Sequence, residues 1–538
     1  MSGATIVSAE GVAVKALKDI HEPIDERLSR SSRPTNDELD QSLARQLSNL
    51  VHPQHEKGEQ EKATIDSDDT FYIDFEDGDR RNPANFSRRR KWAITLMACT
   101  CTLFSSSAAS AYNMGFPSMT RDLNCTKFQA TIGLSVYALG FGIVPLVTAS
   151  FSEEFGRQPL YIGSSFGFLL MYMMVALSKN IQTVIVARFL QGAFGSTGAT
   201  MVGGTIADIW SSQDRGVPMS IFAVAALGGT GLGPVMAGWI EVNPRLEWRW
   251  IQWIQMIIFA AYFILLPVVL TETRTAILLT RIAKKIRKET GDKRYRARVE
   301  DERASLRNLI FISCTRPIHL MFTEPIVLSF SLWIGFAWGV TYCLITSISG
   351  VFKTLHGFNV GEIGTVFITM TIGSLMGFVC NMYQESLYRN SIAQRGPEAR
   401  LHMACFAAIL LPIGMFIFAW SSFSHVHWVV QAIGVTVYIW ATFIIYLAVF
   451  SYLADCYGPF ASSALAGQSL ARNLMATAFP LFTDQMFRRL GYNWANTLFA
   501  FIALIMIPIP FVLFFYGPTV RRHSKFSRMV LEAAQTKK

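Results

Sequence analysis

The stretch 229–238 reads GTGLGPVMAG and lies in an apolar run of the chain that contains no charged residue. Gly229 and Gly233, four residues apart, lie on one face of a helix and let a second helix approach closely. Pro234 removes one backbone hydrogen bond and permits a bend, which membrane-spanning helices tolerate. With Gly238 completing the pattern, the stretch predicts a membrane-spanning helix that packs tightly against its neighbours.

Apolar runs of similar length recur along the chain. Of its 538 residues, 51% are hydrophobic and only 16% are charged, whereas soluble domains carry about 25% charged residues. A run of about 20 apolar residues is long enough to cross the hydrocarbon core of a bilayer. The sequence predicts twelve such spans, at 92–116, 128–150, 159–177, 182–209, 217–240, 250–270, 323–351, 361–382, 402–420, 428–453, 462–486 and 494–516.

The placement of charge predicts how these spans are oriented. Residues 1–91 hold 14 Lys/Arg and 18 Asp/Glu, and residues 271–322 hold 13 Lys/Arg and 6 Asp/Glu. The basic run 88–91 directly precedes Trp92 and an apolar segment, which indicates a cytosolic N-terminus. Twelve spans then return the C-terminus to the cytosol. We therefore expect a multi-pass protein of the plasma membrane, rather than of the vacuolar membrane.

The predicted fold class is an all-α membrane protein with two six-helix bundles. Six spans, a basic loop and six more spans indicate two equivalent halves with a cavity between them. The predicted parts are a largely disordered cytosolic tail at 1–91, a bundle at 92–270, a basic cytosolic loop at 271–322, a bundle at 323–516 and a cytosolic tail at 517–538. We expect a monomer whose partners are membrane lipid and a small molecule.

Several function classes are disfavoured by the sequence. The net charge of +10 does not indicate a nucleic-acid partner, because the basic residues cluster beside apolar spans. A Walker A sequence is absent, which argues against ATP-driven transport by this chain. The sequence contains no HExxH, G-x-S-x-G or Cys/His cluster. We therefore expect no enzyme activity, no catalytic residue, no cofactor and no metal.

The loop after the second predicted span reads SEEFGRQP and contains Glu153, Glu154, Gly156 and Arg157. Arg157 is placed to pair with a carboxylate at a neighbouring helix end, such as Asp208, as a charge latch that holds the cytosolic side closed. The alternative is an ordinary positive-inside arginine beside two solvated glutamates.

Two arginines lie inside predicted spans, Arg188 in the fourth and Arg472 in the eleventh. A charged arginine at mid-span costs roughly 2.5 kcal/mol or more and favours a polar cavity. Because Arg188 is near the outer end of its span, the alternative is a side chain that reaches the interface. Glu324 and Asp455 lie at the cytosolic edges of two spans, where either a latch or helix-end capping is expected.

These motifs resemble those of the major facilitator superfamily, in particular its fungal twelve-span drug:proton antiporter branch. The superfamily pattern G-x-x-x-G-P-x-x-x-G matches all four fixed positions of 229–238, and R-x-x-Q-G matches Arg188, Gln191 and Gly192. The loop pattern G-x-x-x-D-R-x-G-R-R matches only at Gly156-Arg157, and this departure is similar to the fungal form L-S-E-x-F-G-R-x-P. The resemblance covers about residues 85–520.

The resemblance implies two bundles that rock about a central cavity, with an inward proton driving an outward substrate. It ties Arg188, Gln191, Gly192 and Arg472 to proton coupling and to the cavity. The cargo it implies is a small amphipathic molecule such as a secondary metabolite, a drug or a glycolipid of the mannosylerythritol type. The alternative is a facilitator or exporter of an organic anion such as a dicarboxylate, bound by Arg188 and Arg472.

Polyamine-type members of the superfamily tend to carry a Glu-Ala-Phe-Pro stretch after a Gly-x-x-Tyr in the seventh span. In this chain Thr346 stands at the position of the carboxylate. A polycation needs a buried anion, so this departure disfavours a polyamine cargo.

Two sequons lie on opposite sides of the predicted membrane. Asn124-Cys125-Thr126 follows the first span and is predicted to be outside, where it is a candidate for N-glycosylation. Asn85-Phe86-Ser87 precedes the first span and is predicted to be cytosolic.

Overall fold

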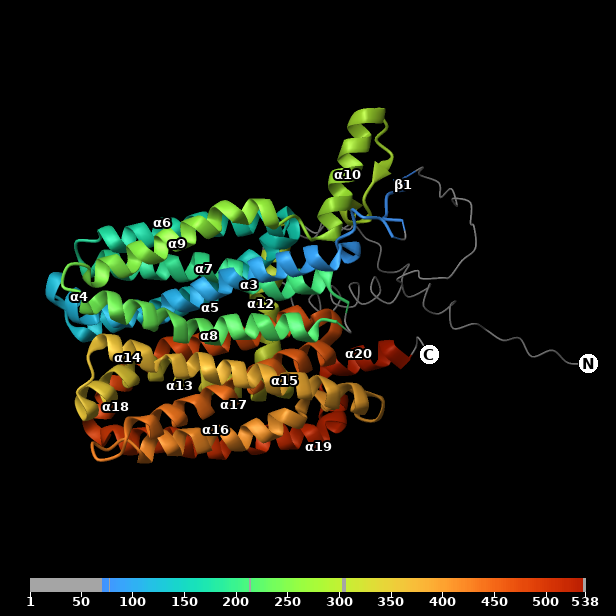
Figure 1. The fold of residues 1–538 in the computed structure, drawn as a ribbon. Coiled ribbons are helices and arrows are strands. Elements are labelled where there is room, and N and C mark those ends of the chain that lie inside the picture. The colour runs from blue at the N-terminus through green and yellow to red at the C-terminus, as the bar shows by residue number, and fades with distance from the viewer. Residues whose placement is uncertain (1–69, 77, 212–213, 302–305, 536–538) are drawn as a thin grey trace, which may run out of the picture. The chain divides into compact units, whose positions relative to one another are not determined.

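The computed structural model describes residues 70–76, 78–211, 214–301 and 306–535. The predicted disorder of the N-terminal tail therefore lies, for residues 1–69, outside the described part of the chain. The described residues belong to one compact unit, Ala63–Lys538. Within it, two sets of long helices form two bundles (Figure 1).

The first bundle begins close to the predicted first span. Its elements are α3 (Arg88–Ala111), η3 (Tyr112–Gly115), α4 (Phe116–Asp122), α5 (Lys127–Phe155), α6 (Arg157–Leu177), α7 (Ile181–Ile209), α8 (Gly216–Val242) and α9 (Glu247–Val269). The second bundle contains α13 (Pro325–His356), α14 (Val360–Val366), α15 (Ile368–Arg395), η4 (Gly396–Leu401), α16 (His402–Trp420), α17 (Trp428–Tyr457), η5 (Gly458–Phe460), α18 (Ala461–Met506) and α19 (Pro508–His523).

The remaining elements lie at one end of the bundles (Figure 1). They are β1 (Phe71–Tyr72), η2 (Pro83–Asn85), α10 (Thr275–Thr290), β2 (Tyr295–Arg296), α11 (Arg298–Asp301), α12 (Leu306–Thr323) and α20 (Lys525–Gln535). We call this the α10 end. The opposite end, where α4 lies and α14 begins, is the α4 end.

Eight stretches of the described residues are long and apolar enough to span a membrane. Two of them, Val360–Trp420 and Trp428–His523, each join more than one helix. Helix α7 is outside the eight because its glycines and the polar Arg188 and Gln191 lower its mean hydropathy. When the joined helices are counted separately and α7 is included, the described chain has six spanning segments in each bundle.

Element α18 consists of two helices that meet at a kink, in agreement with the two predicted spans 462–486 and 494–516, and the second of these spans continues into α19. The break between them is at Gly491, whose φ of 75° lies in the left-handed region that favours glycine. The chain therefore turns there without a separate loop.

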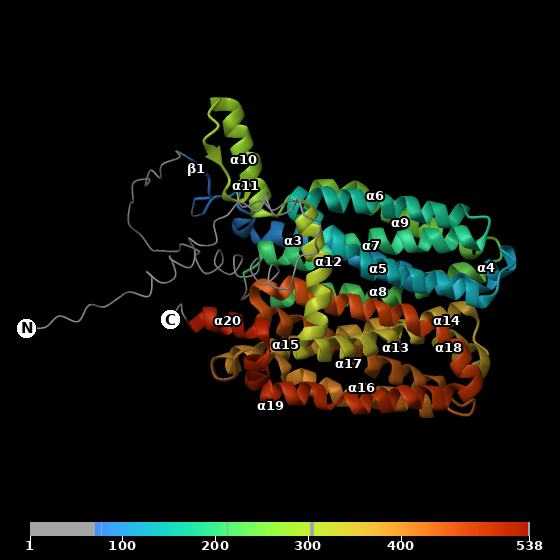
Figure 2. The same cartoon turned by 180° about the vertical axis from the view of Figure 1, so that it is seen from behind.

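The segment between the bundles is more ordered than a basic loop. Helix α12 contacts both bundles, and Figure 2 shows it crossing the direction of the spans. Its Ser313 hydroxyl is 2.8 Å from that of Ser150 in α5. Its Pro317 carbonyl oxygen lies 2.7 Å from where a Cβ on Gly467 of α18 would be, so glycine permits this approach.

A short parallel pairing of β1 with β2 joins the N-terminal segment to the segment between the bundles. Phe71 is opposite Tyr295, and Tyr72 is opposite Arg296. Backbone N–H groups of Phe71 and Ile73 donate to carbonyl groups across the pair at 2.9 and 3.0 Å. This pairing is a small exception to the predicted all-α fold.

Candidate functional site

A cavity of about 970 Å³ lies between the two bundles. Helices α3, α5, α7 and α8 line it on one side, and α13, α15, α17 and α18 line it on the other. The cavity extends to the α10 end, where charged side chains line it, among them Glu153, Arg274, Arg389 and Asp455. Its volume is that of a site for a drug-sized molecule.

At the α4 end, the two bundles are in direct contact. The ammonium group of Lys127 in α5 is 2.9 Å from the carboxylate of Asp484 in α18. The side-chain amide of Asn113 donates to the carbonyl of Ile345 in α13 at 2.7 Å. The cavity is therefore closed toward the α4 end and reaches the α10 end.

The motif in α8 places its glycines where other helices come closest. A Cβ on Gly229 would lie 2.8 Å from the carbonyl oxygen of Leu103 in α3. A Cβ on Gly233 would overlap the carbonyl oxygen of Ser107 in the same helix. These two glycines therefore permit the packing of α8 against α3, as the four-residue spacing predicts.

The rest of the motif faces the second bundle. A Cβ on Gly238 would lie 2.6 Å from the carbonyl oxygen of Val360, at the start of α14. The carbonyl group of Pro234, which is buried inside α8, lies against Gly364 of α14. The motif thus forms part of the contact that closes the cavity at the α4 end.

The predicted pair of Arg157 with Asp208 is present. Nε of Arg157, at the start of α6, is 2.6 Å from Oδ2 of Asp208, near the end of α7. The guanidinium also donates to the carbonyl of Met201 at 3.2 Å. However, both residues belong to the first bundle, so in this conformation the pair joins two helices of one bundle and does not hold the α10 end closed.

A further carboxylate, Glu272, completes this cluster and was not singled out from the sequence. It is 4% exposed and accepts hydrogen bonds from the backbone N–H groups of Arg157 and Gln158, the first residues of α6, at 3.1 and 3.3 Å. Gly156, with a φ of 93°, precedes that helix, and a Cβ there would overlap the Glu272 carboxylate. Glu272 therefore stabilises the positive end of α6.

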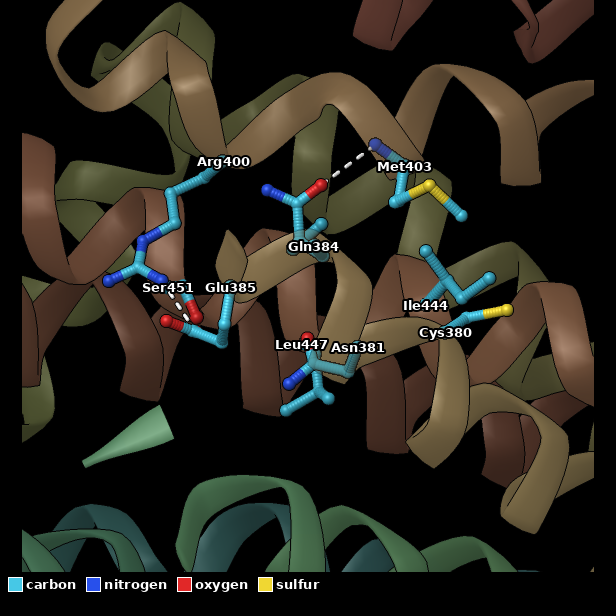
Figure 3. Close-up of a pocket in the computed structure, with 10 residues that line it drawn as sticks. Cys380, Asn381, Gln384, Glu385, Arg400, Met403, Ile444, Leu447 and Ser451 are labelled. Carbon is cyan, nitrogen blue, oxygen red and sulfur yellow. Dashed lines mark hydrogen bonds and ion pairs between the residues drawn. The ribbon is translucent and has the colours of Figure 1, made fainter. Parts of the chain in front are cut away.

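The second bundle has an equivalent ion pair. Nε of Arg400, just before α16, is 3.1 Å from Oδ2 of Asp455, near the end of α17. Nη1 of Arg400 also donates to Glu385 at 2.8 Å (Figure 3). Burial lowers the pKa of Arg400, but attraction by Asp455 and Glu385 outweighs this and raises it overall. Asp455 was expected to be a latch or a cap, whereas Arg400 and Glu385 were not singled out.

Glu324 acts as a cap for the C-terminal helix. It is 1% exposed and lies at the N-terminus of α13. Its carboxylate accepts from the hydroxyl of Tyr457 at 2.9 Å, from the backbone N–H of Phe526 at 3.2 Å, and from the hydroxyl of Ser524. The capping alternative for Glu324 therefore describes its contacts better than a latch between the bundles.

Glu153 and Glu154 are the two glutamates that were predicted to belong to the latch in the 152–159 segment. Glu153 is half exposed, and its carboxylate is 3.9 Å from the guanidinium of Arg274. Glu154 lies in the last turn of α5, at the α10 end. Within the described part of the chain, Glu153 forms no hydrogen bond or ion pair with Arg157.

Arg188 is enclosed within the first bundle and does not reach the interface. The residue is fully buried, and its guanidinium lies 4.3 Å from the ring centroids of both Tyr112 and Tyr137. It donates to the carbonyl of Ala108 at 3.0 Å and to Oε1 of Gln191 at 2.8 Å. The expected alternative of a side chain that extends to the membrane surface is therefore not what the structure has.

The expectation that Arg188 and its neighbours line the cavity needs correction. Arg188, Gln191 and Gly192 are not among the described residues that line it, although Tyr137 is. A Cβ on Gly192 would overlap the backbone carbonyl of Tyr137, so Gly192 permits close packing of α7 on α5. Arg188 thus lies one layer behind the cavity wall.

Arg472 of α18, by contrast, lines the cavity and is 7% exposed. Its guanidinium lies 4.6 Å from the ring centroid of Trp338 and 5.0 Å from that of Tyr446. Nη2 donates to the hydroxyl of Ser469 at 3.3 Å. Of the residues predicted to combine intramembrane charge with the cavity, Arg472 is the one that the structure places there.

The two sequons lie at opposite ends of the bundle. Asn124 is exposed at the α4 end, with a φ of 46°, and Thr126 of the same sequon caps α5. Asn85 is exposed in η2 at the α10 end, and its side-chain amide donates to the carbonyl of Asp79. In the described residues, no group of three or more His, Cys, Asp or Glu side chains is arranged to hold a metal ion.

Comparisons with known proteins agree with this architecture. Residues 98–459 match the family model described as Major Facilitator Superfamily. The chain is 34% identical over 465 residues to the MFS-type transporter paaT of Penicillium rubens, covering 85% of this chain and 83% of that one. It is also 34% identical over 465 residues to the MFS-type efflux pump MFS2 of Trichophyton rubrum, covering 85% and 78%.

A solved structure shares the fold at low sequence identity. The proton:xylose symporter XylE, bound to 6-bromo-6-deoxy-D-glucose, aligns with a TM-score of 0.58 at 14% identity. The alignment covers 80% of this chain and 96% of that one. At this identity the likeness concerns the fold alone.

Proposed function

The chain belongs to the major facilitator superfamily, and we propose that it is a secondary active transporter that exports a small amphipathic organic molecule in exchange for protons. The observation that carries this proposal is the cavity of about 970 Å³, which lies between the bundles, is closed toward the α4 end and reaches the α10 end. Relatives named as efflux pumps support outward transport of organic compounds.

The proposed mechanism is an exchange of contacts between the two ends. In the present conformation, the contacts of α8 with α14 and of Lys127 with Asp484 close the α4 end. Substrate would enter from the α10 end and leave after these contacts separate and the α10 end closes. Because the Arg157–Asp208 and Arg400–Asp455 pairs each lie inside one bundle, they would move as part of rigid units.

Proton exchange would use carboxylates that meet the cavity. The described carboxylates that line it, Glu153, Asp214, Glu385 and Asp455, lie toward the α10 end. No carboxylate forms a described ion pair with Arg188, whose partners are carbonyl groups, an amide and two tyrosine rings. We therefore propose that Arg188 does not exchange protons with an adjacent carboxylate, and that it instead fixes the packing of Tyr137 against the cavity.

We further propose that the α10 end is cytosolic and that the protein acts as a monomer in the plasma membrane. The positively charged segment between the bundles lies at this end, as orientation rules require of a cytosolic side. The cargo would be a secondary metabolite, a drug-like compound or a glycolipid.

Transport under an imposed pH gradient tests the proposal. Vesicles containing the full chain would be loaded with candidate compounds, which are identified by profiling medium and cells after deletion of the gene. Efflux that requires the gradient and stops with a proton uncoupler is expected. Efflux that is unchanged by the uncoupler would favour the alternative, an uncoupled facilitator. Accumulation inside vesicles against a gradient that should drive export would contradict the proposed direction.

A further inference from the structure

We propose that the deep part of the cavity contains an anion subsite, in which Arg472 binds the carboxylate of an aromatic or similarly flat organic acid. This inference rests on the proposed transport function, since it names the class of substrate that the same cavity would take. The evidence for the subsite is the set of contacts around the Arg472 side chain.

Arg472 lies well away from the polar end of the cavity. It is the twelfth residue of α18, which places it about 17 Å along the helix from Ala461 at the α10 end. Such a depth is near the middle of a hydrocarbon core about 30 Å thick. A guanidinium at that depth is costly unless it is paired or faces a polar cavity.

The protein satisfies only part of the hydrogen-bonding capacity of Arg472. A guanidinium has five N–H donors, and the described donation is from Nη2 to Ser469 at 3.3 Å. Nε is buried and has no hydrogen-bond partner among the described residues. Nε and an adjacent Nη together form the planar fork that binds a carboxylate through two parallel hydrogen bonds.

Arg472 also lacks a negatively charged partner within the described part of the chain. The carboxylates that line the cavity are toward the α10 end, where Arg400 already binds Glu385 and Asp455. Arg188 is also without a carboxylate, but it is packed behind the cavity wall, where its Nε and Nη1 donate to carbonyl and amide oxygens and its Nη2 has no partner among the described residues. Arg472 is therefore a cation that meets the cavity and that a ligand anion would neutralise.

The aromatic residues beside Arg472 favour a flat ligand body. Trp338 and Tyr446 are stacked, with ring centroids 5.7 Å apart and planes inclined by 30°. Both residues line the cavity together with Tyr342. A ligand whose carboxylate binds Arg472 can place a ring against these side chains, where stacking adds to apolar burial.

The test is equilibrium binding to the purified full-length protein, with 2-naphthoate and its uncharged isostere 2-naphthamide as probes. The two probes have the same ring system and differ in charge at one end. We expect 2-naphthoate to bind roughly tenfold or more tightly than 2-naphthamide, the size of one charge-assisted hydrogen bond. In Arg472→Gln this preference should fall to within about twofold, with little change in the affinity for the amide.

A matched control removes a different cavity arginine. Arg389 lines the cavity at its exposed α10 end, so Arg389→Gln lowers the cavity charge by the same amount. This variant should keep the preference for 2-naphthoate. Arg472→Lys provides a second variant that keeps the charge but loses the planar fork, and it should show an intermediate preference. Thermal unfolding of each variant identifies a protein that has not folded.

Several outcomes would overturn the subsite. They are equal binding of the two probes by the unchanged protein, no binding of either probe, a preference that survives in Arg472→Gln, or a preference lost equally in Arg389→Gln. Binding is measured without a gradient, so it does not depend on proton coupling. A protein that prefers 2-naphthoate but shows no gradient-driven efflux would retain the subsite and contradict the proposed export mechanism.

Discussion

Nε of Arg157 lies 2.6 Å from Oδ2 of Asp208, and this contact joins the start of the third span to the end of the fourth span in the first bundle. Arg400 and Asp455 make the same connection between the third and fourth spans of the second bundle. The two pairs are separated in sequence by 51 and 55 residues. The two halves of the chain thus share the same ion-pair arrangement, although no repeat is visible in the identities of their residues.

This relationship predicts that Asp208→Asn destabilises the first bundle. The side chains of Arg157 and Asp208 are 10% and 24% exposed, so the variant leaves a mostly buried cation without its partner. We expect the free energy of unfolding to fall by roughly 2 kcal/mol. This is less than for a fully buried pair, because Asp208 is partly solvated. Thermal unfolding of the purified protein measures it. Glu289→Gln, which removes the exposed pair with Lys285, should change the unfolding midpoint little, and equal midpoints for both variants would contradict the prediction.

The packing of α8 predicts that Gly233→Leu abolishes export while the protein still reaches the membrane. Any Cβ at Gly233 overlaps the backbone of Ser107, so a leucine must push α3 and α8 apart. The measurement is efflux normalised to the amount of protein in the membrane. Gly163→Leu is the matched control, because a Cβ on exposed Gly163 has no atom within 4 Å. Normal export by the Gly233 variant would mean that this close approach is not needed for transport.

Sequence patterns predicted the contacts that depend on local spacing. Glycines at fixed intervals in 229–238 indicated a close helix–helix approach, and the structure contains it. The position of Asp208 at a helix end similarly indicated a partner for Arg157. Both cases depend on the helical repeat and on which spans are neighbours, which the order of apolar segments indicates.

Contacts that depend on tertiary arrangement could not be predicted in the same way. Glu272 follows the sixth span, and only the folded bundle brings it to the start of α6. Hydropathy also does not distinguish the interior of one bundle from the cavity between two, which is why Arg188 was expected at the cavity. Helices α10 and α12 were missed because both lie within 271–322, a segment whose overall basic charge matched the composition of a loop.

The positions of the sequons predict which asparagine is modified. If glycosidase treatment increases the mobility of the protein on a gel, the shift should vanish in Asn124→Gln and persist in Asn85→Gln, because the proposed outer end is the α4 end. Thr126→Ser serves as a control that keeps both the sequon and a hydroxyl able to cap α5. A shift that depends on Asn85 instead would invert the proposed orientation.

The buried setting of Arg188 predicts that lysine replaces it poorly. The guanidinium donates to Ala108 and Gln191 and lies between the rings of Tyr112 and Tyr137. A lysine ammonium is a compact charge without a planar fork, so it cannot hold these partners from one position. Losing one charge-assisted hydrogen bond of about 1.5–3 kcal/mol corresponds to roughly a tenfold or greater fall in efflux, if this packing is needed in the transport cycle.

The measurement for Arg188→Lys is efflux from loaded vesicles under an imposed pH gradient, normalised to protein amount, with Arg188→Ala expected to lose more. Arg389→Lys is the matched control, since Arg389 is exposed and its charge is retained. Binding of a transported compound without a gradient separates a damaged cavity from damaged coupling. Unchanged binding with lost efflux would assign Arg188 to the conformational or proton-linked step. Near-normal efflux for Arg188→Lys would instead show that a buried positive charge suffices. The planar fork of donors would then have no role in transport.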